Sequence, residues 1–422
     1  MNGQRAWFGQ PPGLTILFLT NMWEQFSYFG MRALLVYYMT KQLMIGQGSS
    51  SVIYGAYTAC AYFTPIVGGV IADRLLGKRR AIITGGSIMA AGHFMMTFEP
   101  LFYPALATIA IGNGLFLPSL PSQIDDLYEP GDPRIGWAYN VYYVGVNIGG
   151  FLAPLICGTL GELYGWHYGF GAAGIGMVLG LLIYIGGQRH LPAQERRAAA
   201  AETAGRFERQ TVLVLAGIAL SVTVFRGAYE QVGNTVALWA DAGVDRAAGA
   251  LTIPMTWFQS LNPLLVMLMT PPLLRYWRQR SEDGRHEAPA RKMATGALIV
   301  GGAYLLLALV ALLADGRAAW AWLVLFFAVF TFGELFILPT GLGLFARLAP
   351  AGLGATTVAA WYITIFSGSL TAGLVGTLWS RMGHGAYFAL LAGIAAVAAL
   401  LLRTLDRPLS QLLAAQETGR TE

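Results

Sequence analysis

The sequence contains little charge. Lys, Arg, Asp and Glu together make up 12% of the 422 residues, whereas hydrophobic residues make up 55%. Soluble domains average about 25% charged residues, so this composition predicts a polytopic membrane protein rather than a soluble one. The net charge of +5 is carried by short segments between apolar runs. We therefore attribute it to membrane topology and expect no binding of nucleic acid.

Cysteine is also scarce. The two cysteines, Cys60 and Cys157, lie inside apolar runs, so we expect neither a disulfide framework nor a Cys/His metal site. A group of four acidic residues, at a spacing that fits no calcium loop, comprises Asp125, Asp126, Glu129 and Asp132. No nucleophile and base stand at a recognised catalytic spacing. We accordingly expect no metal, no cofactor and no enzymatic activity.

Apolar segments long enough to cross a bilayer recur along the whole chain. A transmembrane helix needs about 20 apolar residues, which predicts about twelve spans and an all-α membrane protein. These spans are placed at approximately 14–40, 52–76, 80–98, 101–124, 134–161, 166–187, 211–240, 247–274, 292–314, 318–346, 352–380 and 384–404.

Basic residues cluster in alternate loops. By the positive-inside rule these loops face the cytoplasm, and so do both termini. The basic residues concerned are Arg74, Lys78, Arg79 and Arg80, then Arg189, Arg196, Arg197, Arg206 and Arg209, then Arg275, Arg278, Arg280, Arg285, Arg291 and Lys292. The N-terminal tail runs into the first span without a small-residue cleavage site, so we expect this helix to be retained.

A few ionisable residues lie within the apolar spans. A charge at membrane depth costs about 2.5 to 3.5 kcal/mol on insertion scales, so each one indicates a cavity or a partner. The five residues are Glu24, Arg32, Arg226, Glu230 and Glu334. Arg226 and Glu230 are four residues apart on one helix face, with Asn234 a turn further on. The charges of Arg226 and Glu230 either neutralise each other or belong to a substrate or proton pathway.

Several motifs point to one family. The loop GGVIADRLLGKRR at residues 68–80 resembles the signature between helices 2 and 3 of the major facilitator superfamily. With YFTP at 62–65 before it, the loop is similar to that of proton-dependent oligopeptide transporters. The stretch TNMWEQFSYFGMRALL at 20–35 and YYVGVNIGG at 142–150 agree with this family. In the second half, residues 230–231, 257–263, 333–335 and 361–362 follow in family order.

The resemblance implies a fold of two six-helix bundles. We expect an N-terminal bundle at 1–187, a cytoplasmic linker at 188–210, a C-terminal bundle at 211–404 and a cytoplasmic tail at 405–422. Many bacterial members of the family insert two further helices at the linker. About 22 residues cannot hold two spans of about 20 each, so we expect the short, twelve-helix form.

The same resemblance implies proton-coupled uptake of di- or tripeptides across a bacterial inner membrane, by alternating access with the substrate near the midplane. Arg32 and Glu230 match an inter-bundle salt bridge that contacts the substrate, and Glu334 matches the carboxylate that receives the peptide amino terminus. The substrate-binding residues implied are Tyr28, Arg32, Tyr62, Tyr143, Asn147, Arg226, Glu230, Asn234, Trp257, Gln259, Asn262, Glu334, Trp361 and Tyr362. The residues implied in proton coupling or gating are Glu24, Arg32, Glu230 and Glu334. Asp73 and Arg74, in the loop between helices 2 and 3, are implied in control of conformation.

Four positions depart from the family pattern. Asn21 and Gln25 stand where Glu and Arg are usual, Leu117 stands where Lys is usual, and Arg226 stands where Trp is usual. These changes weaken the case for conventional proton coupling. They predict that the cation has been relocated to Arg226 and that the substrate is peptide-like but not an ordinary dipeptide. A facilitator or exporter of another metabolite or antibiotic, and a membrane receptor that does not transport, remain alternative readings.

Overall fold

The protein is described by a computed structural model covering residues 9–129, 132–192, 207–283, 287–314, 316–350 and 353–418. Most of the predicted linker, including Arg196, Arg197 and Arg206, lies outside these ranges, and so does Arg285. Within these ranges, the chain folds almost entirely into helices. Contacts between residues divide it into two compact units, which are taken one at a time below.

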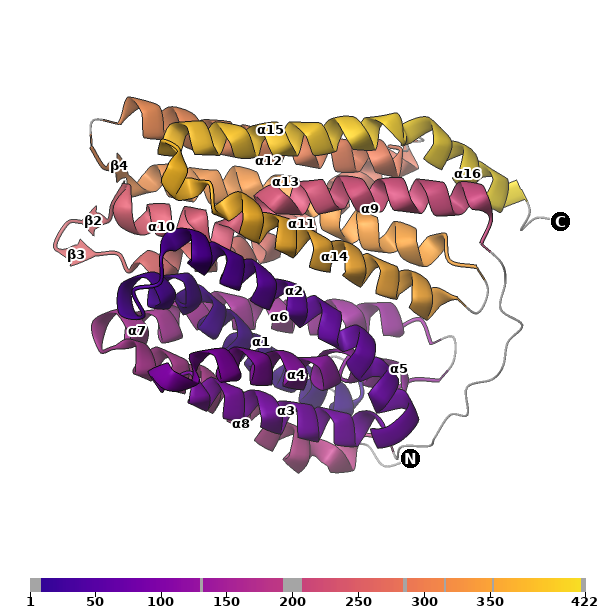
Figure 1. Cartoon of the computed structure of the whole chain (residues 1–422). Helices are drawn as coiled ribbons and strands as arrows, with labels where there is room; N and C mark the ends of the chain where they lie inside the picture. Colours follow the sequence, from indigo (N-terminus) through magenta and orange to yellow (C-terminus); the bar gives the residue numbers. More distant parts are fainter. Residues whose placement is uncertain are drawn as a thin grey trace. The chain divides into compact units, whose positions relative to one another are not determined.

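The first unit comprises Met1–Ile45, Cys60–Ala198 and Ala248–Leu264, as far as these are described. Its helices α1, α3, α4, α6 and α8 run side by side, with α1 packed on both α6 and α8 and α3 packed on α4 and α8 (Figure 1). The helices of this half of the sequence, including the short 3-10 or π-helical turns labelled η, are α1 (Pro12–Tyr37), η1 (Tyr38–Gln42), α2 (Gln47–Ile71), η2 (Ala72–Leu76), α3 (Lys78–Met95), η3 (Glu99–Leu101), α4 (Phe102–Ser119), α5 (Ser122–Asp125), α6 (Ile135–Ala153), η4 (Pro154–Gly158), α7 (Thr159–Leu163), α8 (Trp166–Gly187) and η5 (Gln188–His190).

The second unit comprises Gly46–Ala59, Ala199–Ala247 and Leu265–Glu422, again within the described ranges. Here α12 packs on α13 and α15, and α9 packs on α14 and α15. The elements of this half of the sequence are α9 (Arg209–Tyr229), η6 (Glu230–Gly233), α10 (Thr235–Ala242), β1 (Val244–Asp245), β2 (Ala247–Ala248), β3 (Leu251–Thr252), η7 (Met255–Ser260), α11 (Leu261–Glu282), α12 (Pro289–Leu313), β4 (Ala318–Ala319), α13 (Trp320–Arg347), α14 (Gly354–Gly376), η8 (Trp379–Arg381), α15 (His384–Thr404) and α16 (Asp406–Thr418). The short strands β1 and β4 pair in parallel, and β2 pairs with β3.

Each unit takes in a segment from the other half of the sequence. The start of α2, residues 46–59, groups with the second unit, and η7 with the first residues of α11 groups with the first. The predicted division into an N-terminal and a C-terminal bundle is based on chain order, whereas these units follow contacts. The two exchanged segments are the places where the sequence halves touch within a single unit.

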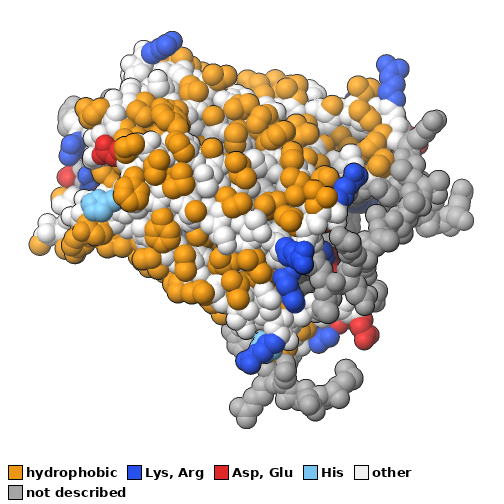
Figure 2. Space-filling view, turned by 60° about the horizontal axis from the view of Figure 1, so that its bottom comes forward, with side chains coloured by type: hydrophobic (Ala, Val, Ile, Leu, Met, Phe, Trp, Pro, Cys, Tyr) orange, Lys and Arg blue, Asp and Glu red, His pale blue; other side chains and the backbone are white. Residues whose placement is uncertain are grey.

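Many of the helices have the length and composition of membrane spans. Among the described residues, nine helical segments are long and apolar enough to cross a bilayer. The helices α1, α3 and α11 have comparable lengths but are less apolar. Hydrophobic side chains are spread over the face seen in Figure 2, where charged side chains lie mainly toward the edges. Such a surface is suited to contact with lipid tails.

Two predicted spans have different structures from those expected. The span at 211–240 is not one helix, because the 3-10 turn η6 interrupts it from Glu230 to Gly233. The span at 247–274 is wrong at its start: residues 247–260 form β2, β3 and η7, and α11 begins only at Leu261. Gly249 has a positive φ of 65°, which favours glycine and ends regular structure there.

Glycines allow close packing inside the first unit, and one of them gives a testable prediction. A Cβ atom at Gly68 in α2 would overlap the carbonyl group of Gly114 in α4. We expect Gly68→Ala to destabilise the protein by about 1 to 3 kcal/mol or more, because the backbone of α4 has to move. Thermal unfolding of purified protein measures this loss. Gly186→Ala in α8 is the matched control, since a Cβ there meets no atom within 4 Å. Equal melting temperatures for both variants would contradict the prediction.

Candidate functional site

The polar face of α1 is buried and hydrogen-bonded within the first unit. Glu24 is only 1% exposed, and its carboxylate accepts a hydrogen bond of 2.7 Å from the side-chain amide of Gln25. The amide of Asn21 donates to the backbone oxygen of Tyr142 in α6 at 3.0 Å. Asn21 and Gln25, the two residues of α1 that depart from the family pattern, therefore both serve as neutral hydrogen-bond donors here.

The other predicted site residues of α1, α2 and α6 differ in burial. Arg32 and Tyr62 are partly buried, whereas Tyr143 is 49% exposed. Tyr28 is buried and meets Phe29 edge to face, with ring centroids 5.4 Å apart. Asn147 is also buried, and its amide donates to the carbonyl of Tyr143 one turn earlier, at 2.9 Å.

Three more predicted residues come from η7 and the start of α11. Trp257 donates from its indole nitrogen to the hydroxyl of Thr159 in α7 at 2.8 Å. Gln259 donates to the backbone oxygen of Ala33 in α1 at 3.1 Å, and Asn262 is partly buried. The structure thus ties this segment of the second sequence half to helices of the first.

A buried ion pair occupies the end of α9 in the second unit. Arg226 and Glu230 are each 2% exposed, and the guanidinium donates directly to the carboxylate. The prediction that these side chains lie on one helix face is confirmed. The Cβ position of Gly368 in α14 lies 2.6 Å from the Cβ of Arg226, so only glycine leaves room for this side chain. The pair is therefore embedded between helices rather than directed to lipid.

Tyr229 connects this pair to Glu334, a link that the sequence interpretation missed. The guanidinium carbon of Arg226 lies 5.2 Å from the centroid of the Tyr229 ring, within cation–π range. The Tyr229 hydroxyl donates to the Glu334 carboxylate in α13 at 2.7 Å. Phe330, one turn before Glu334, stacks on the same ring at 5.4 Å. The available sequence signal was a tyrosine three residues after Arg226, on the same face of a helix that bears intramembrane charges.

Asn234 takes part in a second polar cluster of this unit. The hydroxyl of Ser51, near the start of α2, donates to the Asn234 side chain at 3.1 Å. Asn234 in turn donates to Gln231 at 3.3 Å, and Gln231 donates to the backbone oxygen of Ala372 in α14 at 2.8 Å. Asn234 follows the 3-10 turn η6 and therefore lies outside α9, the helix that carries Arg226.

The two aromatic residues predicted in α14 lie in the second unit. Trp361 is 4% exposed and packs against Phe345, with ring centroids 5.3 Å apart. Its ring fills the space beside Gly341 in α13. Tyr362 is partly buried. Trp361 thus has the burial expected of a packing residue as well as of a pocket wall.

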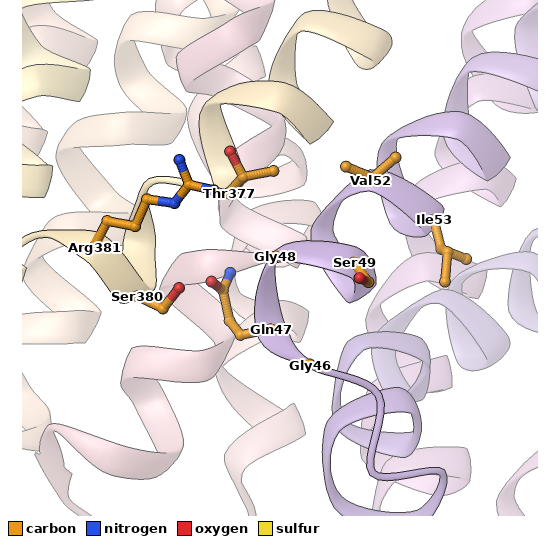
Figure 3. A pocket seen from close by; sticks show the side chains of 9 residues that line it. All are labelled: Gly46, Gln47, Gly48, Ser49, Val52, Ile53, Thr377, Ser380 and Arg381. Atoms are coloured by element: carbon orange, nitrogen blue, oxygen red, sulfur yellow. The ribbon is translucent and has the colours of Figure 1, made fainter.

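A cavity of about 660 Å³ opens at the end of the second unit where α2 begins. Figure 3 shows Gln47 and Ser380 opposite each other at this cavity, with Arg381 beside them. Gln47 donates to the hydroxyl of Ser51 and to the backbone oxygen of Gly376. The lining residues are Gly46, Gln47, Gly48, Ser49, Val52, Ile53, Thr377, Ser380 and Arg381, none of which was predicted as a site residue.

The loop after α2 carries the two residues predicted to control conformation. Asp73 and Arg74 lie in the π-helical turn η2 and are exposed. In this region Lys78 forms an ion pair with Asp126 at 2.7 Å and also donates to the backbone oxygen of Ser122. The predicted roles of Asp73 and Arg74 stay predictions.

Two of the acidic residues between α4 and α6, Asp126 and Asp132, form ion pairs with Lys78 and Arg134. Asp132 accepts hydrogen bonds from Arg134, which lower the pKa of that carboxyl below its usual value. Within the described ranges, no three His, Cys, Asp or Glu side chains are grouped to hold a metal ion.

Comparison with known proteins identifies the family. Residues 79–206 and 192–390 match the POT family (PTR2). The chain belongs to the POT family. The two matched segments overlap at residues 192–206, inside the predicted linker.

Several known proteins are similar in sequence to this chain over nearly its full length. The chain is 30% identical to the di-/tripeptide transporter of Lactococcus lactis subsp. lactis, over 97% of this chain and 98% of that protein. It is 29% identical to the peptide transporter YePEPT of Yersinia enterocolitica, over 89% of both chains. A crystal structure of a peptide transporter POT in complex with sulfate matches with a TM-score of 0.88 at 28% identity, covering 96% of this chain and 97% of that one. The predicted fold, an all-α membrane protein of the major facilitator type, is confirmed.

Proposed function

We propose that this POT-family protein is a secondary transporter of small peptides or peptide-like amphoteric solutes, which it moves by alternating access. The observation that carries the proposal is the set of buried charges in long apolar helices, above all Arg226, Glu230 and Glu334. A soluble-protein core rarely holds such groups, and in membrane helices they mark substrate and ion pathways. The names of the bacterial relatives and of the similar crystal structure support a peptide as the substrate class.

A peptide is a zwitterion, and the chain offers charges of both signs. Arg32 and Arg226 are suited to bind a carboxylate, and Glu334 is suited to bind an ammonium group through charge-assisted hydrogen bonds. The remaining predicted residues, from Tyr28 to Tyr362, then supply neutral hydrogen bonds and aromatic walls. Arg226 already pairs with Glu230, so a substrate carboxylate must compete with Glu230 for it. This competition supports a substrate that differs from an ordinary dipeptide.

Proton coupling forms part of the proposal. Three buried carboxylates, Glu24, Glu230 and Glu334, are available to take up a proton, and protonation of Glu230 would release Arg226. In this role Glu24 has the neutral amide of Gln25 as its hydrogen-bond donor. The family usually has a cation at position 25. The division into bundles at 1–187 and 211–404, a linker at 188–210, a tail at 405–422 and both termini in the cytoplasm complete the proposed organisation in a bacterial inner membrane.

Uptake into proteoliposomes tests the function. We expect at least one radiolabelled di- or tripeptide or peptide-like amphoteric solute to accumulate when the lumen is more alkaline than the medium, and to equilibrate only slowly without that gradient. A protonophore added during uptake provides the control for coupling. Uptake that is independent of both pH and membrane voltage would contradict proton symport and favour a facilitator. Failure of every di- and tripeptide to bind or enter would refute the peptide substrate.

A further inference from the structure

A single carboxylate joins the two halves of the sequence inside the first unit. Glu162, in α7, accepts three hydrogen bonds from the start of η7: from the backbone N–H of Met255 at 3.0 Å, from the backbone N–H of Thr256 at 2.9 Å and from the Thr256 hydroxyl at 2.7 Å. The donors sit on both carboxylate oxygens. Neither Glu162 nor its partners belong to the residues that the family resemblance implies.

Neighbouring contacts reinforce this junction. The hydroxyl of Thr159, one turn before Glu162, accepts the indole N–H of Trp257 at 2.8 Å. The side chain of Thr256 fills the space beside Gly158, where a Cβ atom would collide with it. The backbone N–H groups at the start of a helical segment otherwise lack partners, so a carboxylate placed there satisfies them and favours the helix dipole. The end of α7 and the start of η7 are thus locked together by charge-assisted bonds.

The location of this junction gives it a function. It lies at the end of α7 that connects to α8 through residues 164–165, a loop that the distribution of basic residues places outside the cytoplasm. Figure 1 shows α7 at the same end of the first unit as the strand β3. In alternating access, one half of a transporter rocks against the other and opens first one side and then the opposite one. A bond between the two sequence halves at this end has to break before the protein opens outward.

We propose that the Glu162 carboxylate is a latch that holds the two sequence halves together on the non-cytoplasmic side, and that its release favours the outward-open conformation. The proposal rests on alternating access but not on the identity of the substrate. The corresponding contacts in the second unit, from Ser51 to Asn234 and from Gln47 to Gly376, are between neutral groups. Hydrogen bonds to a charged group are stronger than neutral ones, so each bond to Glu162 contributes more than a bond in these neutral contacts.

Spin labels test the latch without any transport substrate. Tyr164 and Leu251 are 67% and 75% exposed and lie on the two sides of the junction. In a background with Cys60→Ser, Tyr164→Cys and Leu251→Cys carry the labels, and electron–electron double resonance reports their distance in nanodiscs. Relative to its parent, Glu162→Gln should raise the ratio of long to short distances about tenfold, because it removes the charge from three hydrogen bonds. Thr256→Val, which removes only the hydroxyl donor, should give a smaller change in the same direction.

Glu99→Gln is the matched control. Glu99 also accepts a side-chain hydrogen bond, from Gln42 at 2.6 Å, but both residues belong to the first half of the sequence. We expect its distance distribution to equal that of the parent. An unchanged distribution in Glu162→Gln, or an equal shift in Glu99→Gln, would overturn the latch. A shift specific to Glu162 in a protein that transports no peptide would retain the latch and refute the proposed function instead.

Discussion

Replacing Arg226 by methionine is expected to destabilise the protein by about 3 to 5 kcal/mol, because the change removes a cation that is paired directly with the buried Glu230 carboxylate. Both side chains are 2% exposed, so water cannot replace the lost partner. The change also removes the guanidinium from the face of Tyr229. Thermal unfolding in detergent, followed by size-exclusion chromatography of the surviving protein, measures the loss.

The double variant Arg226→Met with Glu230→Met separates pairing from general damage. Replacing both members of a buried ion pair with apolar groups is often neutral or stabilising, so we expect most of the lost stability to return. Arg246→Met is the matched control for an ion pair near the surface. Arg246 and Asp241 lie 3.4 Å apart with side chains 18% and 22% exposed, and such pairs contribute about 0 to 1 kcal/mol. A double variant as unstable as the single one would show that Arg226 acts through packing alone.

Most of the membrane-length helices could be predicted from the sequence, since apolar length is a local property of the chain. The positions at which the helices begin, end or break could not be predicted. Glu230 begins a 3-10 turn in the middle of a predicted span, and nothing in the composition around it marks that break. Likewise, residues 247–260 are apolar enough to be counted in a membrane helix, but their hydrogen bonds go to short strands and to α7.

The charged residues of the site could be predicted because a charge in an apolar run is conspicuous. Their partners depended on tertiary contacts. The pairing of Arg226 with Glu230 follows from helical spacing, so it was within reach. Tyr229 contacts Glu334 across 105 positions of sequence, and Glu162 contacts Thr256 across 94, and neither link has a periodic signal. A single sequence shows which groups need partners, whereas the fold decides which groups meet.

These contacts set the charge available for a substrate in the second unit. Arg226 and Glu230 neutralise each other, while Glu334 accepts a bond from a neutral phenol. A family tryptophan at position 226 would leave Glu230 without this intrahelical cation. If the proposed function holds, we therefore expect Glu334 to be the carboxylate that binds a substrate ammonium group. The Tyr229 ring, which donates to Glu334, lies between Phe330 and Arg226.

Neutralising Glu334 should consequently lower transport more than removing the Tyr229 hydroxyl that donates to it. We expect Glu334→Gln to lower peptide uptake about ten- to a hundredfold, since loss of a charged hydrogen-bond partner costs about 1.5 to 3 kcal/mol and a tenfold change corresponds to about 1.4 kcal/mol. Tyr229→Phe keeps the carboxylate and removes only its donor, so uptake should fall by about tenfold or less. Initial rates in proteoliposomes, normalised to the amount of folded protein, measure both.

Tyr304→Phe distinguishes orientation of Glu334 from loss of a buried hydroxyl. Tyr304 is fully buried in the same unit, and its hydroxyl donates to the backbone oxygen of Ala228 at 2.7 Å, next to Tyr229 in the chain. Each Phe variant deletes one hydroxyl that donates a hydrogen bond, but only Tyr229→Phe removes a donor from a charged acceptor. Normalised uptake by Tyr304→Phe should equal that of the parent. If both variants lost uptake equally, Tyr229 would act through the packing of α9 and not through Glu334.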